Sequence, residues 1–380
     1  MKVNPVVEGM GEYAIGALAE QARRLRSEGK RVLDFSIGDP REPTPPFIPE
    51  ALKAAVPKIS QYPTTAGLPE LREAVAGYLK RRFGADVDPD TQVIPTSGSK
   101  EAIFSTALAF VDRDQQHSVV WPTPGYPIYE RGARFAGASV APVALASDFI
   151  FRAGDLGRDA WSRAAMVWIC SPHNPTGSIT SRDDLADLVT AAREGGAWLC
   201  SDECYSDIYD EAPPSSVLEV AGPGAEGVLA YFSLSKRSGM TGYRSGVVVG
   251  DASAIRLIKL LRTSTGTASP EFVQRAAIAA WSDDDHVGER RRIFSQKRAI
   301  LGAACEAAGM PVIASHGAIY LWVRVGDDLA ISDRLLSQGI LVTPGRVFGK
   351  GGEGYIRLAL VPALSECDEA AEVLGKCLTA

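Results

Sequence analysis

The residues around Lys236 carry the clearest chemical signal in this sequence. Lys236 stands in the segment Ser-Leu-Ser-Lys-Arg-Ser-Gly-Met-Thr-Gly-Tyr-Arg-Ser-Gly, residues 233–246. A lysine amine can form an imine with an aldehyde, and burial or neighbouring cations lower its pKa towards the reactive neutral form. Ser233, Ser235 and Arg244 add hydroxyl and guanidinium groups that suit a phosphate. The segment therefore predicts an enzyme whose lysine holds a phosphorylated aldehyde cofactor.

Three polar residues at or near predicted strands could hold the rest of such a cofactor and its substrate. Asp202 follows an apolar strand, where a carboxylate needs a cation such as a pyridinium N–H; a helix N-cap is the alternative. Asn174 lies among prolines and could donate its amide to a phenolate oxygen, although an Asn-Pro turn also explains it. Arg357, inside an apolar strand, predicts a bidentate carboxylate partner or an internal salt bridge.

Two weaker signals complete the set. Gly98-Ser99-Lys100 opens a predicted helix, and unpaired N–H groups at a helix N-terminus can bind an anion. An ordinary helix start is the alternative reading. Tyr126, in Pro-Thr-Pro-Gly-Tyr-Pro-Ile-Tyr after a strand, could stack on a flat heteroaromatic ring, or could be a core tyrosine in a turn.

Together these segments resemble the fold type I pyridoxal-phosphate enzymes, and within them the class I/II aminotransferases. The resemblance extends from Gly38 to Arg357. The segments 233–246 and Phe-Ser-Ile-Gly-Asp-Pro-Arg-Glu-Pro-Thr-Pro (35–45) are most similar to the N-succinyldiaminopimelate aminotransferases of lysine biosynthesis. Those enzymes usually carry asparagine where this chain has Gly239, a difference that leaves the cofactor residues intact and weakens the substrate assignment.

The resemblance implies a role for each residue. Lys236 would form the imine with pyridoxal 5'-phosphate and then move the substrate proton, while Asp202 would bind the ring nitrogen. Asn174 and Tyr205 would address the phenolic oxygen of the ring, and Tyr126 its face. The phosphate would be surrounded by Gly98, Ser99, Lys100, Ser233 and Arg244, with Tyr62 reaching the phosphate of a partner subunit. The substrate α-carboxylate would be taken by Arg357, Asn174 and the Gly38 backbone. The resemblance also implies a homodimer with active sites shared between the subunits.

The expected reaction is amino transfer from glutamate to a keto or aldehyde acceptor, most closely N-succinyl-2-amino-6-oxopimelate. Transamination of aspartate, alanine, an aromatic amino acid or a secondary metabolite remains an alternative, as does a C–S β-lyase. A non-enzymatic effector-sensing domain is disfavoured, because residues 1–45 are too short and insufficiently basic for a DNA-binding domain. Arg41, Arg237 and Arg346 are candidates for extra contacts with a succinylated substrate.

The pattern of apolar residues indicates which elements position these groups. Helices are predicted over 14–28, 47–57, 68–83, 99–111, 125–136, 182–194, 269–281 and 284–309. Strands are predicted over 31–37, 92–95, 117–121, 138–143, 165–170, 197–201, 228–232 and 245–249, and again over 312–314, 318–325, 339–343 and 355–359. This order predicts a three-layer α/β/α large domain, residues 46–283, with a mostly parallel seven-stranded sheet. A smaller α+β domain would combine both termini, residues 1–45 and 284–380.

Composition excludes several other classes of protein. The 380 residues include 46% hydrophobic and 23% charged side chains and carry a net charge of −6, which argues against nucleic acid as a partner. The six cysteines are scattered, and only Cys200 and Cys204 lie close together, without nearby histidine ligands, so reduced thiols and no metal site are predicted. No window approaches the roughly 20 apolar residues needed to span a bilayer, and the N-terminus lacks a signal-peptide pattern, so a cytoplasmic protein without membrane partners is expected.

Overall fold

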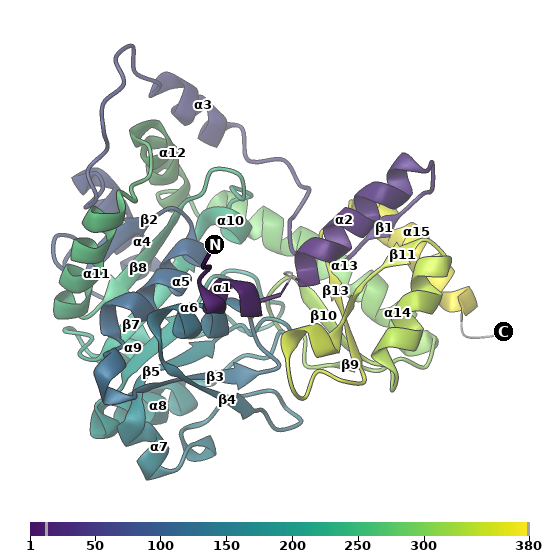
Figure 1. Cartoon of the computed structure of the whole chain (residues 1–380). Coiled ribbons are helices and arrows are strands. Elements are labelled where there is room, and N and C mark those ends of the chain that lie inside the picture. The colour runs from purple at the N-terminus through teal and green to yellow at the C-terminus, as the bar shows by residue number, and fades with distance from the viewer. Residues whose placement is uncertain (12–13, 378–380) are drawn as a thin grey trace.

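The computed structural model describes residues 1–11 and 14–377, and its larger part is built around a seven-stranded sheet (Figure 1). The strand order is β2-β8-β7-β6-β5-β3-β4, and only β8 runs antiparallel to its neighbours. The expected mostly parallel α/β fold is therefore confirmed. The strands are β2 (Val93–Thr96), β3 (Ser118–Thr123), β4 (Ser139–Ala144), β5 (Ala164–Cys170), β6 (Trp198–Asp202), β7 (Val228–Ser233) and β8 (Gly246–Gly250).

Apolar side chains point alternately to the two sides of the central strands, so both faces of the sheet are apolar. In β5, Met166 and Trp168 pack into one core cluster, whereas Val167 and Ile169 pack into the other. Successive side chains of a strand point to opposite faces, so helices must cover both sides. One face packs against α5 (Ser99–Phe110), α6 (Ile128–Ala136) and α11 (Ala252–Thr265). The other packs against α4 (Pro69–Phe83), α7 (Arg158–Arg163), α8 (Arg182–Gly195), α9 (Leu218–Ala221) and α12 (Glu271–Trp281), with α3 (Phe47–Ala54) on α12.

A second, smaller unit forms around an antiparallel sheet with the order β12-β13-β10-β9. Its strands are β9 (Val312–Ile313), β10 (Tyr320–Arg324), β12 (Thr343–Pro344) and β13 (Tyr355–Ala359). Beside it, β1 (Leu33–Asp34) pairs in parallel with β11 (Ile340–Leu341). The surrounding helices are α2 (Ala14–Ser27), α13 (Asp285–Ala307), α14 (Asp328–Ser337) and α15 (Leu364–Cys377). A separate core unites the two sheets with α13 and α15.

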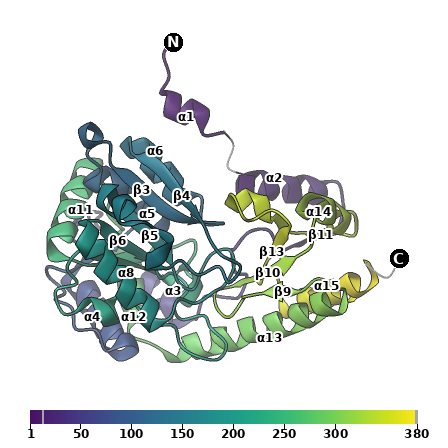
Figure 2. The same ribbon diagram turned by 90° about the horizontal axis from the view of Figure 1, so that it is seen from below.

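Helix α13 connects the two units. It starts beside the seven-stranded sheet, runs along one side of the molecule and packs on α15 in the smaller unit (Figure 2). We propose residues 46–283 as the large domain, and residues 1–45 with 284–380 as the small one, because the two apolar cores separate near the start of this helix.

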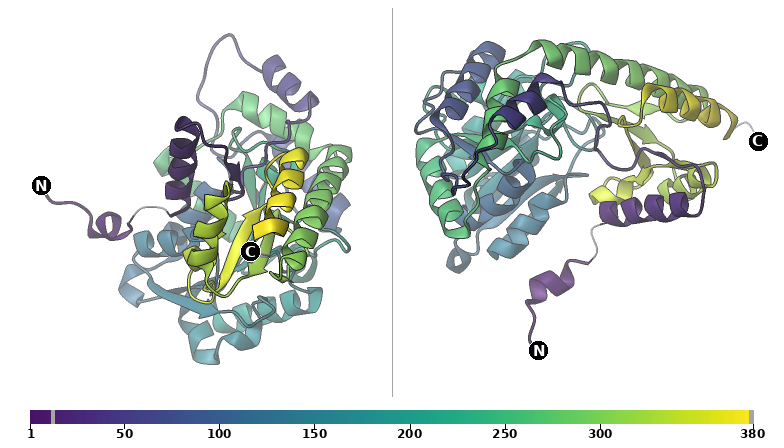
Figure 3. Two further views of the ribbon diagram at one scale, coloured as in Figure 1. Left: turned by 90° about the vertical axis from the view of Figure 1, so that its right-hand side faces the viewer. Right: turned by 90° about the horizontal axis from the view of Figure 1, so that it is seen from above.

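The N-terminal segment departs from this division. Helix α1 (Pro5–Gly9) projects away from α2 and the rest of the small unit (Figure 3). Nη2 of Arg131, on α6, lies 3.5 Å from the carbonyl oxygen of Met10 and donates a long hydrogen bond to it. Across the described ranges, no helix combines the length and the apolar character that a membrane span requires.

Candidate active site

The carboxyl-terminal ends of the parallel strands bring the predicted residues together. Tyr126 follows β3, Asn174 follows β5, Asp202 ends β6, and Lys236 follows β7 on the single turn α10 (Leu234–Arg237). The register pairs Cys170 with Asp202, and Asp202 with Tyr231. Ligands of open α/β sheets bind at this edge, because loops and helix N-termini point into the crevice there.

A cavity of about 260 Å³ lies at this edge. Its lining includes the predicted residues Gly38, Ser99, Lys100, Tyr126, Asn174, Asp202, Tyr205, Ser233, Lys236, Arg244 and Arg357. Ile37, Ile103, Cys204, Ser235 and Tyr320 complete it. The smaller unit contributes only the 37–38 segment, Tyr320 and Arg357, so the cavity lies where the two units meet.

Lys236 lies deep enough in the cavity for its charge to be disfavoured. Burial lowers the pKa of Lys236 to about 8, Asp39 and Cys204 oppose this shift, and Arg244 and Arg357 add to it. Its Nζ donates a hydrogen bond to the carbonyl oxygen of Gly38. A lysine with a depressed pKa offers a neutral amine near physiological pH, the form that attacks an aldehyde.

Asp202 is a buried carboxylate that lacks a cationic side-chain partner among the described residues. Its Oδ2 accepts a hydrogen bond of 2.9 Å from the hydroxyl of Tyr129, and its Oδ1 accepts one of 3.3 Å from the backbone N–H of Cys204. Burial is the main cause that raises the pKa of Asp202. A protonated pyridine nitrogen would supply the missing positive partner, so this residue fits the ring of pyridoxal phosphate.

The phosphate end of the cavity is built from a helix N-terminus and cations. Gly98 precedes α5 with φ +82°, and no side chain caps that helix. A Cβ on Gly98 would lie 2.3 Å from Nη2 of Arg244. Burial, followed by the charges of Arg131 and Arg244, lowers the pKa of Lys100. The hydroxyl of Ser233 caps α10 at 3.1 Å from the Ser235 N–H. This arrangement fits a phosphate.

Arg357 is held by neutral groups that leave its charge available. Its Nη1 donates to Oδ1 of Asn174 at 3.0 Å, and its Nη2 donates to the Ser36 carbonyl at 2.7 Å. The guanidinium carbon lies 4.3 Å from the ring centre of Tyr320 and 4.6 Å from that of Phe348. Arg357 forms no ion pair in the described part of the chain, and its buried Nε has no hydrogen-bond partner. The internal salt bridge that was the alternative for Arg357 is therefore not formed among the described residues. A substrate carboxylate could supply the anion instead.

Two tyrosines of the site were missed by the sequence analysis. Tyr129 hydrogen-bonds Asp202, and its i, i+3 spacing from Tyr126 at the start of α6 was the available signal. Tyr320, from β10 of the small unit, forms a 2.8 Å hydroxyl–hydroxyl hydrogen bond with Tyr205. A Cβ on Gly38 would lie 2.4 Å from the Tyr320 hydroxyl, so the absence of a side chain at Gly38 lets the proline-rich segment 38–44 approach that ring. No local pattern around Tyr320 indicated this contact.

Several candidate residues lie outside the cavity lining. Gly98 shapes the phosphate end, where Arg244 approaches the N-terminus of α5, without lining the cavity. Tyr62 is fully exposed on the loop between α3 and α4. The three arginines considered for a succinyl group are paired elsewhere. Arg41 lies 3.1 Å from Glu366, and Arg346 lies 2.6 Å from Asp328. Arg237 is buried against Asp207 and Asp284, so none of these three arginines faces the cavity.

Comparisons with known proteins agree with this geometry. The model of the family "aminotransferase class I and II" matches residues 30–374. An LL-diaminopimelate aminotransferase of Dehalococcoides mccartyi is 35% identical over 370 residues, which covers 95% of each chain. The 4-dedimethylamino-4-oxo-anhydrotetracycline transaminase OxyQ of Streptomyces rimosus is 36% identical over 351 residues and covers 92% of this chain and 94% of its own.

Solved structures give the same result. An aminotransferase from Neisseria meningitidis superposes with a TM-score of 0.91 at 35% identity, over 99% of this chain and all of the other. A probable N-succinyldiaminopimelate aminotransferase from Thermus thermophilus gives 0.89 at 28% identity, over 95% and 99% of the two chains. The match over most of the chain, together with the buried lysine, carboxylate and arginine, identifies the family: the chain belongs to the class I and II aminotransferases and is a pyridoxal-phosphate-dependent transaminase of fold type I.

Proposed function

We propose that this aminotransferase moves an amino group between glutamate and an acceptor with the diaminopimelate skeleton. The cavity that joins Lys236, Asp202 and Arg357 carries the proposal, because it combines an amine, a ring-nitrogen partner and a carboxylate site. Bound pyridoxal phosphate supplies an aldehyde and an electron-withdrawing ring. The roles that the sequence predicts for the other cofactor-binding and substrate-binding residues belong to the same proposal.

In this proposal each side chain has a defined task. Arg357 binds the substrate α-carboxylate. Asn174 orients Arg357, because Nη1 of Arg357 donates a hydrogen bond of 3.0 Å to Oδ1 of Asn174. Asn174 then has its amide nitrogen left for the phenolic oxygen of the ring. Lys236, whose pKa burial lowers to about 8, would take the proton from the substrate Cα and deliver it to C4′, the aldehyde carbon of the cofactor. Asp202 keeps the ring nitrogen protonated, which favours withdrawal of electrons from that carbon.

The form of the diaminopimelate substrate is the finer part of the proposal. The segments 35–45 and 233–246 favour the N-succinylated compound, whereas the relatives from Dehalococcoides mccartyi and Aquifex aeolicus, which are named LL-diaminopimelate aminotransferases, favour free LL-diaminopimelate. A succinyl carboxylate would need a further cation. Because Arg41, Arg237 and Arg346 are paired elsewhere, we favour free LL-diaminopimelate.

A direct assay tests this choice. The purified protein with pyridoxal phosphate is incubated with 2-oxoglutarate and either LL-diaminopimelate or N-succinyl-LL-diaminopimelate, and glutamate formation is measured. We expect kcat/KM for the free compound to exceed that for the succinylated one by about tenfold, or about 1.4 kcal/mol. Lys236→Ala is the control and should give no turnover. Lack of glutamate from both compounds would contradict the proposal.

A second candidate is a transaminase of secondary metabolism. OxyQ is as similar to this chain as the diaminopimelate enzymes are, and it is named a transaminase of a 4-oxo-anhydrotetracycline. Glutamate consumption with a polycyclic ketone, in the absence of diaminopimelate turnover, would favour this candidate. Release of pyruvate and a thiol from cystathionine would instead indicate a C–S β-lyase.

A further inference from the structure

The residue after the candidate lysine is a buried arginine. The Arg237 side chain is 4% exposed and does not line the active-site cavity. Its Nε donates to Oδ2 of Asp207 at 2.9 Å, its Nη1 donates to the Ala280 carbonyl at 2.7 Å, and its Nη2 donates to Oδ1 of Asp284 at 2.6 Å and to the Asp283 carbonyl at 3.2 Å. The rings of Tyr78 and Trp281 flank its guanidinium at 4.8 and 5.2 Å.

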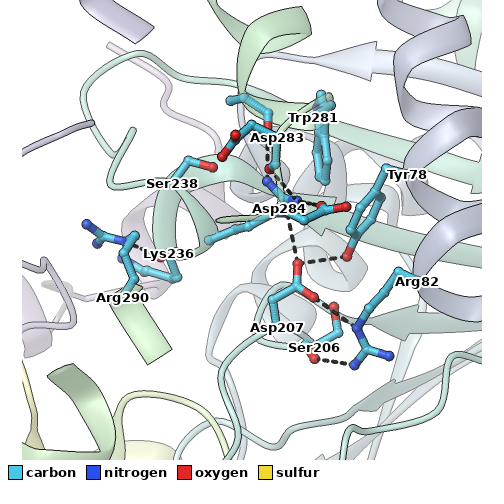
Figure 4. A network of polar contacts seen from close by, with 12 residues as sticks. Tyr78, Arg82, Ser206, Asp207, Lys236, Ser238, Trp281, Asp283, Asp284 and Arg290 are labelled. Carbon is cyan, nitrogen blue, oxygen red and sulfur yellow. Dashed lines mark hydrogen bonds and ion pairs between the residues drawn. The ribbon is translucent and has the colours of Figure 1, made fainter. Parts of the chain in front are cut away.

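Asp207 is the hub of this network (Figure 4). Its Oδ2 accepts from Arg237 and from the Tyr78 hydroxyl, each at 2.9 Å, and its Oδ1 accepts from Nε of Arg82 at 3.0 Å. Arg82 also donates to the Ser206 carbonyl at 2.9 Å. A buried ion pair is weak evidence for stability, because desolvation offsets the attraction, so a network this complete suggests control of geometry.

The Asp207–Arg237 pair joins the two segments that carry the reacting groups. Asp207 is on the short segment that starts at Asp202 and includes Tyr205, whereas Arg237 directly follows Lys236. Helix α10 has only four residues, and one isolated helical turn is unstable in water. Its orientation must therefore come from tertiary contacts, and Arg237 supplies four of them.

Residues from the start of α13 hold the rest of this turn. Nε of Arg290 donates to the Lys236 carbonyl at 3.3 Å, and a Cβ on Gly239 would lie 2.9 Å from Nη1 of Arg290. His286 bridges the Ser238 hydroxyl, at 2.9 Å from Nε2, and Asp283, at 2.5 Å from Nδ1. Ser238 is fully buried, so this serine, histidine and aspartate set serves as an anchor and not as a nucleophilic triad.

We propose that Arg237 is a positioning residue for Lys236: its ion pair with Asp207 fixes the distance between the lysine and the Asp202 segment. This inference rests on the proposed role of Lys236. Without Arg237, the α10 turn can shift while the cavity and its other groups stay in place. A shift of about 1 Å in a reacting group is enough to lower a rate by orders of magnitude.

The test compares two buried arginines. Arg237→Gln removes the ion pair and keeps an amide, and Arg237→Lys restores the charge. Arg298→Gln is the matched control, because Arg298 is buried, contacts Asp210 at 2.6 Å and donates to the Ala318 carbonyl, yet touches neither α10 nor Asp202. Each protein is stripped of cofactor, and the rate at which it captures added pyridoxal phosphate is followed by absorbance. Circular dichroism of the bound cofactor, kcat, KM and the melting temperature are also measured.

The expected results separate positioning from stability. Arg237→Gln should capture the cofactor about tenfold more slowly, change its circular dichroism and lower kcat about tenfold, with KM for the amino donor changed less than about twofold. Arg237→Lys should recover part of each loss. Arg298→Gln should lower the melting temperature and leave capture and kcat within about twofold.

The outcomes are unambiguous. If Arg237→Gln lowers only the melting temperature, as Arg298→Gln does, the proposal is wrong. If Arg237→Gln does not fold, Asp207→Asn decides, because it removes the charge that pairs with Arg237 and keeps a side chain of the same shape; capture at the wild-type rate then overturns the proposal. Wild-type protein that captures cofactor no faster than Lys236→Ala would instead refute the proposed role of Lys236.

Discussion

At the scale of single residues, the site contains two buried ionisable groups, Asp202 and Arg357, that pair with no opposite charge among the described residues. Asp202 has no cation beside it, and Arg357 has no anion, in the portion of the chain that the structure describes. Burying such groups is costly, and a ligand that carries the complementary charges offsets that cost. A cationic ring nitrogen and an anionic substrate carboxylate meet both requirements. The chemistry of the ligand can thus be derived from the protein side alone.

Arg357→Lys tests the carboxylate site. Lysine keeps the positive charge and loses the planar fork, the bond to Asn174 and the contacts with the Tyr320 and Phe348 rings. We expect KM for the amino donor to rise about 10- to 100-fold, or about 1.4 to 2.8 kcal/mol, with a smaller change in kcat. Steady-state kinetics measure both values. An unchanged KM would show that the carboxylate binds elsewhere.

Glu203 gives a pH-dependent prediction that does not involve substrate. Burial raises the pKa of Glu203 from 4.5 to about 7; Oε1 accepts from the Ser201 hydroxyl and the Val217 N–H, and Oε2 has no partner. The folded state therefore binds the proton more tightly than the unfolded state. Its stabilising contribution is complete below pH 4.5 and is lost as the pH rises through about 7.

Glu203→Gln mimics the protonated side chain and should remove this dependence. Between pH 5 and 7 the wild type should lose about 1.4 kcal/mol per pH unit relative to the variant, with no further divergence well above pH 7. Thermal unfolding of both proteins across this range measures the difference. Parallel curves at every pH would mean that Glu203 titrates at its ordinary pKa in the folded protein.

At the scale of elements, the site follows from strand order. Because β3, β5, β6 and β7 are parallel, the residues after them meet at one edge, although they are spread from Tyr126 to Lys236 in sequence. Each polar residue could therefore be predicted as soon as its strand was recognised. The backbone at that edge also shapes the site, because Gly98 lacks a side chain and so leaves Arg244 the space to reach the α5 N-terminus.

Gly98→Ala should weaken cofactor binding. The added Cβ would lie 2.3 Å from Nη2 of Arg244 and displace its guanidinium. Gly222→Ala is the matched control, because Gly222 has φ 79° and ψ 172°, close to the φ 82° and ψ 156° of Gly98, with no atom near its Cβ position. Both variants should lose stability through backbone strain. Only Gly98→Ala should raise the Kd for pyridoxal phosphate, by about tenfold or more. Equal Kd values in the two variants would argue against a phosphate site formed by Arg244 and the N-terminus of α5.

The sequence predicted some elements better than others for physical reasons. Most strands of the large sheet are buried on both faces and are therefore short, continuous apolar runs, which made them recognisable in the sequence. Helix α11 was not among the expected elements, although Asp251 caps it through the N–H groups of Ser253 and Ala254. Helices α14 and α15 were also not expected. Tyr320 and Arg237 could not be assigned, because the contacts of each depend on how segments far apart in sequence pack together.

At the scale of the whole molecule, one proline-rich strap connects the active site with the small unit. Along residues 38–44, the Gly38 carbonyl accepts from Lys236, Glu42 pairs with the buried Lys297 of α13, and the Thr44 hydroxyl donates to the Gly239 carbonyl at 2.7 Å. The same strap thus contacts the lysine turn and the helix that joins the two units. Movement of α13 would be transmitted through these contacts to Lys236 and to Gly239, which follows the α10 turn.

The last prediction concerns the second subunit that the family usually has. Tyr62 is fully exposed in the single chain, on a loop that also exposes Val56 and Ile59. We propose that its hydroxyl reaches the phosphate site of the partner. Tyr62→Phe should then raise the Kd for pyridoxal phosphate by about tenfold to 100-fold, the loss of one hydrogen bond to a charged group.

Mixed dimers distinguish action across the interface from action within one chain. Each hybrid combines a Lys236→Ala subunit with a Tyr62→Phe subunit, so that only the site with the intact lysine can work. If Tyr62 acts in the partner, that site receives the intact tyrosine of the Lys236→Ala subunit and binds cofactor with wild-type affinity. If Tyr62 acts in its own chain, the working site keeps the weakened affinity of the Tyr62→Phe homodimer. Cofactor titration of differently tagged, co-purified hybrids measures this affinity, and the weakened value would refute the shared site.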